Sequence, residues 1–281
     1  MNYNFGRPGI WLYILSMVIA LMATEEVLFL LRNKEFQPSA WPCYLGTFLV
    51  MGTAGIPIYW PRTVLPMPED HFKLLFFSLI LSFLLVIAEE MRRYQEPGKS
   101  MIRIGLSMLT IIYIGGLMSF FAFLRLLFDA EKPHANEWGM LALLSMIIVV
   151  KLSDSGAFFT GKLIGKNKLI PRLSPGKTIE GSLGGLVAAC LGSWFAFGFL
   201  LPWFIPDAPS LGAVNIIAYG LLVGIAGMLG DLAESLFKRD MESKDSSTWL
   251  KGLGGILDIM DSLLFAAPIA WFCWTIGLVG P

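Results

Sequence analysis

Long apolar runs separated by short polar segments make up most of the chain. About 20 apolar residues are needed for a helix to cross a bilayer, and runs of about that length recur along the sequence. They cover residues 9–31, 41–60, 72–88, 104–128, 138–153, 181–204, 214–236 and 256–278. The fifth run is short and could continue through Asp154 toward Leu163, and a ninth helix follows if two runs have been merged. The pattern predicts an all-α, polytopic integral membrane protein with about eight to nine transmembrane helices.

The basic residues of the short loops predict the orientation in the membrane. Lys and Arg concentrate in cytoplasmic loops. The loops after the third, fifth and seventh runs are rich in Lys and Arg, whereas the loop after the sixth, PWFIPDAPSLGA, has none. The alternation predicts a protein of the cytoplasmic (inner) membrane with both termini outside and its active site facing the cytosol.

Small residues indicate which helices pack closely. The seventh run has glycines three or four positions apart, at Gly220, Gly224, Gly227 and Gly230. Such a stripe lets another helix approach closely, whereas the third and fourth runs are bulkier and are expected at the periphery. We predict one continuous membrane domain with an N-terminal helical portion, residues 1–137, and a C-terminal catalytic core, residues 138–281.

Composition agrees with a membrane protein and narrows the chemistry. The 281 residues are 56% hydrophobic and 15% charged, and 21 basic residues balance 21 acidic ones, so no overall field attracts nucleic acid. Cys43, Cys190 and Cys273 lie in apolar runs at unrelated spacings, which favours buried thiols over a zinc or redox site. The two histidines, His71 and His134, are too few for a histidine-based metal site and are expected on the outer surface.

Carboxylates at the ends of the last two apolar runs give the strongest functional signal. An ionisable group there is costly unless something compensates it. Residues three, four and seven apart share a helix face, and one face of the seventh run carries Asp231, Glu234, Ser235 and Lys238, of which Glu234 and Ser235 are expected to bind substrate. Asp258 and Asp261 share a face at the start of the eighth run. Oxygen ligands suit Mg²⁺, which often shares its sphere with substrate phosphates, so Asp231, Asp258 and Asp261 are predicted to bind Mg²⁺, alone or with a second cation.

Two segments could bind phosphate. Gly254 and Gly255 precede the eighth run, where backbone amides and the helix dipole favour an anion. Residues 151–185 interrupt an apolar run and carry cations in a loop punctuated by Gly and Pro. The candidate binding residues of this segment are Asp154, Lys162, Ser174, Lys177, Thr178 and Glu180. The alternative is a basic loop that touches anionic lipid heads.

Glu25 and Glu26 lie inside the first apolar run. They either line the cavity from the side or form a structural ion pair.

Four segments in roughly the last 170 residues follow one another in a recognisable order: YIGGLMSFFAFLRLL, SDSGAFFTGKLIGKNKLIPRLSPGKTIEG, GDLAESLFKRDMESKDS and GLGGILDIMDS. Together they resemble the phosphatidate cytidylyltransferases, also called CDP-diacylglycerol synthases. The resemblance implies the reaction of CTP with phosphatidic acid to give CDP-diacylglycerol and pyrophosphate, with the lipid entering from the inner leaflet.

By position, the resemblance makes Asp231, Asp258 and Asp261 the metal-binding acids, and Lys238 is expected to act beside them. The residues that would position the nucleotide and lipid phosphates are Asp154, Lys162, Lys177, Lys238, Arg239, Lys244 and Asp245. A monomer and a homodimer are both compatible with the glycine stripes.

The last motif departs from the pattern of the family it resembles. Lys251 stands where that pattern has Pro, Leu253 where it has His, and Ile259 where it has Arg. The aspartates are present, so the departures concern efficiency and lipid specificity. The alternatives are a cytidylyltransferase or kinase acting on an isoprenoid phosphate or another lipid alcohol, and an ion-coupled transporter that uses the intramembrane acids. The D-x-x-D spacing of Asp258 and Asp261 does not fit the D-x-x-x-D of CDP-alcohol phosphotransferases.

Overall fold

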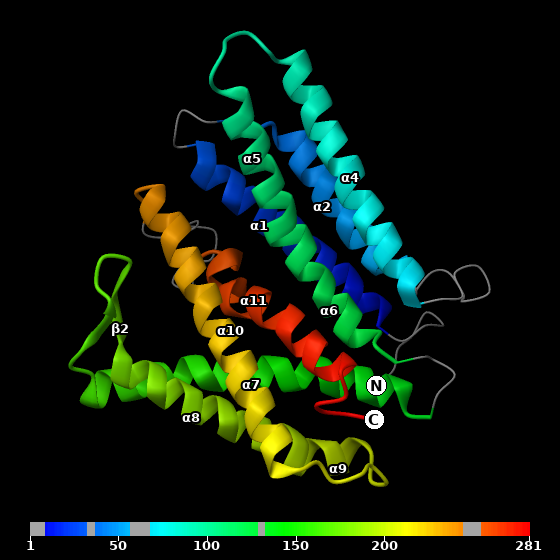
Figure 1. Ribbon diagram of the computed structural model, residues 1–281, viewed down its shortest axis with the longest axis vertical. Helices are drawn as coiled ribbons and strands as arrows, with labels where there is room; N and C mark the ends of the chain where they lie inside the picture. The colour runs from blue at the N-terminus through cyan, green and yellow to red at the C-terminus, as the bar shows by residue number, and fades with distance from the viewer. Residues whose placement is uncertain (1–8, 33–36, 57–67, 129–132, 244–253) are drawn as a thin grey trace. The chain divides into compact units, whose positions relative to one another are not determined.

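The described residues form a set of long helices and a small hairpin (Figure 1). The structure is a computed structural model that describes residues 9–32, 37–56, 68–128, 133–243 and 254–281. Its helices are α1 (Ile10–Arg32), α2 (Ala40–Ala54), α4 (Pro68–Arg92), α5 (Ser100–Thr110), α6 (Leu117–Arg125), α7 (Ala135–Ile164), α8 (Ile179–Phe195), α9 (Leu201–Phe204), α10 (Ala213–Asp240) and α11 (Ile256–Thr275). The described strands are β1 (Lys168–Ile170) and β2 (Ser174–Thr178), which pair antiparallel.

Seven helical stretches within the described residues are long and apolar enough to cross a membrane. Two of them are continuous through π-helical turns: α5 runs into α6 through Ile111–Gly116, and α8 runs into α9 through Ala196–Leu200. The prediction of an all-α, polytopic membrane protein is therefore confirmed. The remaining predicted span, the second run at residues 41–60, corresponds to α2, which has 15 residues and is followed by residues outside the described ranges, so the count of eight or nine stays a prediction.

The fifth apolar run does extend beyond its hydrophobic part. Helix α7 continues through Asp154 to Ile164 and has 30 residues, and Gly156 and Gly161 let it lie close to neighbouring residues over this polar stretch. A Cβ atom on Gly156 would meet the side chain of Ala188, and one on Gly161 would lie 3.1 Å from the Thr178 hydroxyl.

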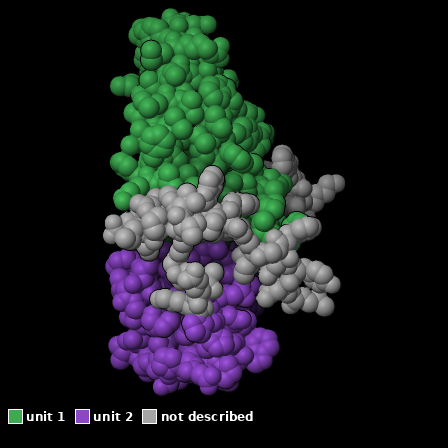
Figure 2. Space-filling view, turned by 90° about the vertical axis from the view of Figure 1, so that its right-hand side faces the viewer, with its two compact units in different colours: residues 1–122, 240–259 green, residues 123–239, 260–281 purple. Residues whose placement is uncertain are grey.

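The chain forms two compact units, coloured separately in Figure 2. Unit 1 comprises residues 1–122 and 240–259, and unit 2 comprises residues 123–239 and 260–281. This division reflects how the residues pack against one another and does not show where catalysis takes place. The prediction that a catalytic core begins at residue 138 therefore stays a prediction.

Unit 1 is held together by apolar packing and by hydroxyl groups that bond between helices. Val50, Val86 and Ile111 form a buried cluster between α2, α4 and the π-helical turn after α5. The Tyr13 hydroxyl of α1 donates to the carbonyl of Met51 at 2.7 Å. Hydroxyls that bond in this way satisfy their polar groups where hydrocarbon offers no partner.

Unit 2 is organised by the glycine stripes. The start of α8 and the second half of α7 lie side by side and run antiparallel, with the hairpin at their shared end (Figure 1). Along α10, a Cβ on Gly220 or Gly224 would press on Ala189 of α8, and one on Gly230 would press on the Asp261 carbonyl of α11. The predicted close approach along the seventh run is confirmed, and its physical reason is the missing side chain.

The predictions for cysteine and histidine hold in part. Cys43 and Cys273 are buried thiols as expected, whereas Cys190 is half-buried on α8 where it faces α10. His134 is exposed just before α7, and His71 lies in the first turn of α4 rather than in a loop.

Candidate functional site

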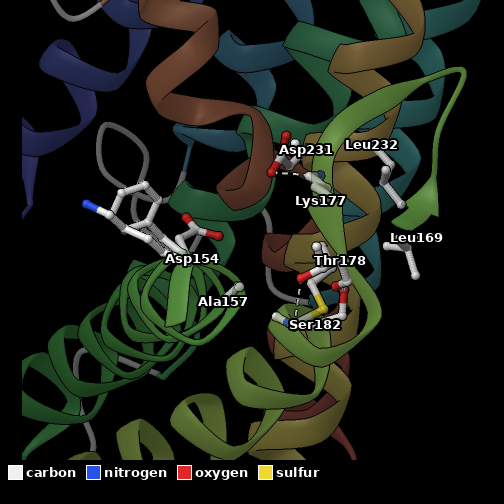
Figure 3. Close-up of a pocket in the computed structure, with 14 residues that line it drawn as sticks. Asp154, Ala157, Leu169, Lys177, Thr178, Ser182, Asp231 and Leu232 are labelled. Atoms are coloured by element: carbon white, nitrogen blue, oxygen red, sulfur yellow. Dashed lines mark hydrogen bonds and ion pairs between the residues drawn. The ribbon is translucent and has the colours of Figure 1, made fainter. Parts of the chain in front are cut away.

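A cavity in unit 2 brings together many of the predicted polar residues (Figure 3). It has a volume of about 440 Å³, a size typical of small-molecule sites. Helices α7, α8 and α10 and the hairpin line it. Its charged residues are Asp154, Lys162, Lys177 and Asp231, and Thr178 and Ser182 add hydroxyls. Phe158, Leu169, Met228 and Leu232 supply an apolar wall, so the cavity can accept a ligand that is polar at one end.

The hairpin that carries Lys177 is fixed to the start of α8. Thr178 caps that helix, its hydroxyl accepting the N–H of Gly181 at 3.1 Å, which is the usual role of Thr at this position. The Glu180 carboxylate accepts the backbone N–H groups of Lys166 and Asn167, each at 3.1 Å. Glu180 therefore holds the start of the hairpin, and a contact between Glu180 and substrate stays a prediction.

An ion pair joins the hairpin to α10. Lys177 Nζ lies 2.7 Å from an Asp231 carboxylate oxygen, and the two side chains point toward one another in Figure 3. Both side chains line the cavity and are 24% and 37% exposed, although the Nζ atom of Lys177 is itself buried against Asp231. Lys177 can compensate the charge of Asp231 while it also offers hydrogen-bond donors to an anion.

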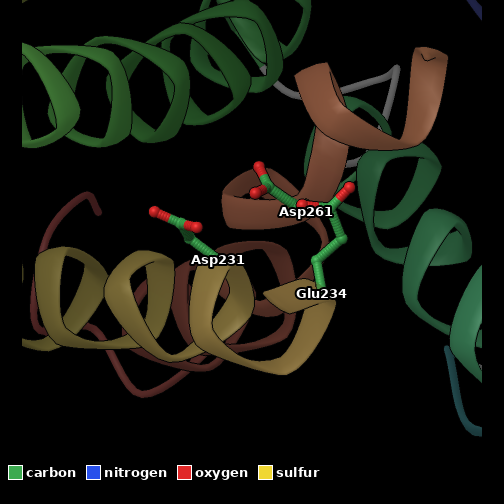
Figure 4. A group of neighbouring side chains, drawn as sticks. All are labelled: Asp231, Glu234 and Asp261. Atoms are coloured by element: carbon green, nitrogen blue, oxygen red, sulfur yellow. The ribbon is translucent and has the colours of Figure 1, made fainter. Parts of the chain in front are cut away.

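Three carboxylates converge next to this pair (Figure 4). Asp231 and Glu234 from α10 and Asp261 from α11 each have an oxygen within 4.8 Å of the others. Glu234 and Asp261 are buried, with 2% and 7% of their surface exposed. Charges gathered at such low exposure repel one another unless a cation lies among or beside them. The oxygen-only donor set fits a hard divalent cation such as Mg²⁺.

The missing side chain of Gly230 makes this convergence possible. Gly230 precedes Asp231, and any side chain on it would collide with the backbone of Asp261. Gly227, one turn earlier, lies near the carbonyl of Ser262, 3.7 Å from where its Cβ would be. The backbones of α10 and α11 are therefore close enough for short Asp side chains to meet.

Glu234 is the residue whose part in this cluster the sequence interpretation missed. It was expected to contact substrate, but its carboxylate lies with the two predicted metal ligands and pairs with Lys238 at 2.9 Å. The signal was its position three residues after Asp231, on the same helix face. Lys238, which was expected to be catalytic, is placed against Glu234, and its catalytic part stays a prediction.

Asp258 lies on the first turn of α11 in unit 1. Its carboxylate accepts the N–H of Gly255 at 2.6 Å, which satisfies a free amide at the start of its own helix. Gly254 has φ of +80°, a conformation that glycine adopts easily. Metal binding by Asp258 and phosphate binding by Gly254 and Gly255 stay predictions.

The same helix start is capped a second time, from α1. The fully buried Glu26 accepts the N–H of Ile256 at 2.8 Å and the N–H of Leu257 at 2.7 Å. This cap joins residues about 230 positions apart and was not among the two roles considered for Glu26. For Glu25 the ion-pair alternative holds, since it lies 3.2 Å from Arg32 and also accepts the Tyr44 hydroxyl.

The remaining predicted residues occupy the edges of the site. Asp154 lies 3.7 Å from Lys151 and accepts the Ser262 hydroxyl at 3.5 Å. Lys162 lies over the ring of Phe158.

Four other residues that the sequence singled out each have only a location, an exposure or a single contact to report. Arg239 donates to the Leu173 carbonyl at the tip of the hairpin, Ser174 lies in β2 and Ser235 is half-buried on α10. Ile259 is 37% exposed. Lys244, Asp245, Lys251 and Leu253 lie outside the described residues.

The comparison with known proteins decides the family. The model of the cytidylyltransferase family matches residues 4–276, nearly the whole chain. The chain belongs to the cytidylyltransferase family. This cytidylyltransferase is 32% identical to the phosphatidate cytidylyltransferase of Bacillus subtilis over 92% of its own length and 87% of the relative.

Two further relatives also match most of this chain. A phosphatidate cytidylyltransferase of Synechocystis is 30% identical and matches 94% of this chain and 88% of its own. The uncharacterized protein YnbB of Escherichia coli is 31% identical over 76% of this chain and 69% of its own. The resemblance inferred from the four motifs is therefore confirmed over a longer stretch than those motifs cover, and nucleotidyl transfer is favoured over ion-coupled transport.

Proposed function

We propose that this cytidylyltransferase transfers the cytidylyl group of CTP to phosphatidic acid and releases pyrophosphate. An oxygen of the phosphatidate phosphate bonds to the α-phosphorus of CTP, and the bond from that phosphorus to the oxygen bridging to the β-phosphate breaks. The products are CDP-diacylglycerol and pyrophosphate. The observation that carries the proposal is the cavity of unit 2, where lysines and a carboxylate cluster meet in a chain of this family.

The acidic cluster supports binding of Mg²⁺. Asp231, Glu234 and Asp261 would hold it, with Asp258 added on the strength of the family resemblance. A bound Mg²⁺ supplies positive charge that offsets the charge developing on the phosphates as the in-line displacement proceeds. A second cation would share oxygens of the substrate phosphates, as Mg²⁺ commonly does.

The chain's own cations would orient the two phosphorylated substrates. Lys162 in the last turn of α7 and Lys177 in β2 both line the cavity, so each can donate to a different phosphate. Holding two anions at reacting distance is itself a large part of catalysis. Lys177 can turn from Asp231 to the triphosphate, since an ammonium group binds phosphate as a point charge.

The lipid would enter sideways from the inner leaflet, with the active site facing the cytosol. Phe158 lines the cavity and is 63% exposed, and Leu163 further along α7 is 80% exposed. Exposed side chains of this kind on a membrane-spanning helix suit contact with acyl chains.

A monomer and a homodimer are the two alternatives for the oligomeric state. Light scattering of the protein in detergent would distinguish them.

The test is an assay of the purified protein in detergent with radiolabelled CTP. Labelled CDP-lipid is expected with phosphatidic acid and Mg²⁺, and little without added metal. Asp231→Asn should lower turnover by roughly a hundredfold or more, as expected for loss of a group that stabilises transition-state charge. Asp207→Asn, an exposed aspartate before α10, is the matched control and should be as active as the wild type.

Parallel reactions separate this function from its alternatives. An isoprenoid phosphate and a lipid alcohol replace phosphatidic acid in two further reactions, and CTP hydrolysis is followed in all of them. Equal or faster transfer to the isoprenoid phosphate would contradict the lipid assignment. Transfer of the γ-phosphate of CTP to the alcohol would identify a kinase instead.

A further inference from the structure

Unit 1 has a second charged cavity, at the polar ends of its helices. Arg92, Arg93, Lys99 and Arg103 line a cavity of about 470 Å³ in which Glu96 is the single acid among the described residues. It lies where α4 ends and α5 begins, and both helices belong to candidate membrane spans. A neighbouring cavity shares Arg92 and Arg93 with it and adds Arg32 from the end of α1 and Trp41 from α2.

Buried carboxylates hold two of these arginines in place through hydrogen bonds. The side chain of Glu89 is 3% exposed and accepts both Nε and Nη2 of Arg92, each at 2.8 Å. The side chain of Glu90 is also 3% exposed and accepts Nε of Arg103 at 2.7 Å. A guanidinium held in this way loses little further freedom when it binds an anion. Among the described residues, these bonds leave Nη1 of both arginines available.

Two further cations are not engaged by acids of the structure. Within the described ranges, neither Arg93 nor Lys99 forms an ion pair. Phosphate groups are the anions that a fork of arginine donors recognises best. The cavity therefore combines oriented guanidinium groups with two cations that no acid of the described residues pairs with.

Exposed apolar residues that neighbour the lining residues in the sequence indicate the source of the phosphate. Met91, Tyr94 and Met101 are 73%, 58% and 82% exposed, and Trp41 is 46% exposed in the neighbouring cavity. Tyr and Trp are enriched where a membrane meets water. A soluble phosphate compound has no long apolar part for these side chains to contact, whereas a lipid has acyl chains next to its phosphate.

We propose that the Arg92–Arg103 region of unit 1 binds the phosphate head group of an anionic membrane phospholipid, at a site separate from the catalytic cavity of unit 2. The arginines held by Glu89 and Glu90 orient the phosphate, and Arg93 and Lys99 compensate its charge. This site does not depend on the function proposed for unit 2.

The test measures equilibrium binding of radiolabelled short-chain phosphatidylglycerol to the full-length protein in detergent micelles. The variant Arg93→Gln/Lys99→Gln removes both unpaired cations and leaves the pairs with Glu89 and Glu90 in place. It should weaken binding roughly tenfold or more, since each cation near a membrane surface attracts an anionic lipid by about 1 kcal/mol. Arg93→Lys/Lys99→Arg keeps the charge and should bind within about threefold of the wild type.

The matched control is Lys168→Gln/Arg172→Gln, which removes two exposed cations from the hairpin of unit 2. Near-normal binding by this control supports a specific site. An equal loss in both double variants would show attraction by loop charge in general and overturn the proposal. Equal binding of phosphatidylcholine, or stronger binding of inorganic phosphate or CTP than of the lipid, would also contradict it.

A final comparison guards against misfolding. Size-exclusion profiles and thermal unfolding of all variants are measured in the same detergent. Because Asp231→Asn leaves unit 1 unchanged, it should bind phosphatidylglycerol normally even when it is inactive. Loss of lipid binding in Asp231→Asn would place the lipid in the catalytic cavity and refute a second site.

Discussion

At the scale of single residues, the decisive feature is where carboxylates lie in an otherwise apolar chain. Charged groups at span ends are costly, and each one described here has an identifiable compensation. Asp231 is paired with Lys177, Glu234 with Lys238, and Glu26 accepts two backbone amides. The polar residues of this enzyme therefore divide into those that bind one another for structure and those left open toward a cavity.

The part of Glu234 in the carboxylate cluster can be tested by one substitution. Glu234→Gln keeps the size of the side chain and removes one charge from the cluster with Asp231 and Asp261. Turnover should fall by roughly tenfold to a hundredfold, as for other transition-state charge stabilisers, and the Mg²⁺ concentration that gives half-maximal rate should rise.

Metal binding gives a second readout that activity alone does not. Mn²⁺ binding followed by electron paramagnetic resonance should be weaker in Glu234→Gln. Asp240→Asn, an exposed acid at the end of the same helix, should leave both measurements unchanged. Unaltered Mn²⁺ affinity in Glu234→Gln would remove this residue from the proposed ligand set.

At the scale of elements, helix ends and glycines position the chemistry. The start of α11 is capped by Glu26 and by its own Asp258, and α10 and α11 approach closely at Gly230. Helix starts have amides with no partner inside the helix, and in an apolar setting each of these must be satisfied. Two carboxylates meet that need for α11.

Glu26→Ala should destabilise the protein by about 3 kcal/mol, because two hydrogen bonds to a charged acceptor are lost and the buried amides are left unpaired. Thermal unfolding in detergent measures this. Exchange of the Ile256 and Leu257 amides with deuterium should become faster. The control is Glu25→Gln, whose partners are Arg32 and Tyr44 and which should leave these two amides protected. Unchanged protection in Glu26→Ala would show that the cap contributes nothing.

Gly230→Ala tests the contact between α10 and α11. The new methyl group would overlap the Asp261 carbonyl oxygen, so the helices must separate and the carboxylates of the cluster must move apart. Turnover and Mn²⁺ binding should both fall, and overpacking of this kind costs about 1–3 kcal/mol of stability. Gly105→Ala, on α5 where nothing lies within 4 Å of the new atom, should be neutral or slightly stabilising.

At the scale of the whole molecule, the alternation of basic and non-basic loops predicts the orientation of the protein in the membrane. The hairpin around Arg172 should face the cytosol, and the loop around Asp207 should lie outside. Arg172→Cys and Asp207→Cys are each introduced together with Cys190→Ala, since Cys190 is the native thiol that is only half-buried.

A membrane-impermeant maleimide should label Asp207→Cys in intact spheroplasts and Arg172→Cys only after lysis. The opposite pattern would invert the topology and place the active site outside. Labelling of both positions in intact spheroplasts would show that the membranes leak and calls for the same test in sealed inverted vesicles.

Much of the fold follows from local properties of the chain. Seven of the predicted spans are helices because their length and apolarity alone satisfy a bilayer. The sequence left two alternatives for α7 beyond Asp154, since a polar segment can end a helix or continue it. The β1–β2 hairpin was not predicted; it is accompanied by contacts of Glu180 with the backbone of residues more than ten positions earlier, which spacing along the chain does not reveal.

For the site, the sequence by itself determined that acids and lysines occur at particular span ends, because such charges are costly in an apolar chain and therefore stand out. Only the tertiary structure decided which of them meet: Glu234 joins Asp231 and Asp261, Lys177 reaches Asp231, and Glu26 caps α11. The physical reason is that spacing along one helix fixes which side chains share a face, whereas contacts between helices depend on how closely their backbones pack, and here glycines such as Gly230 set that distance.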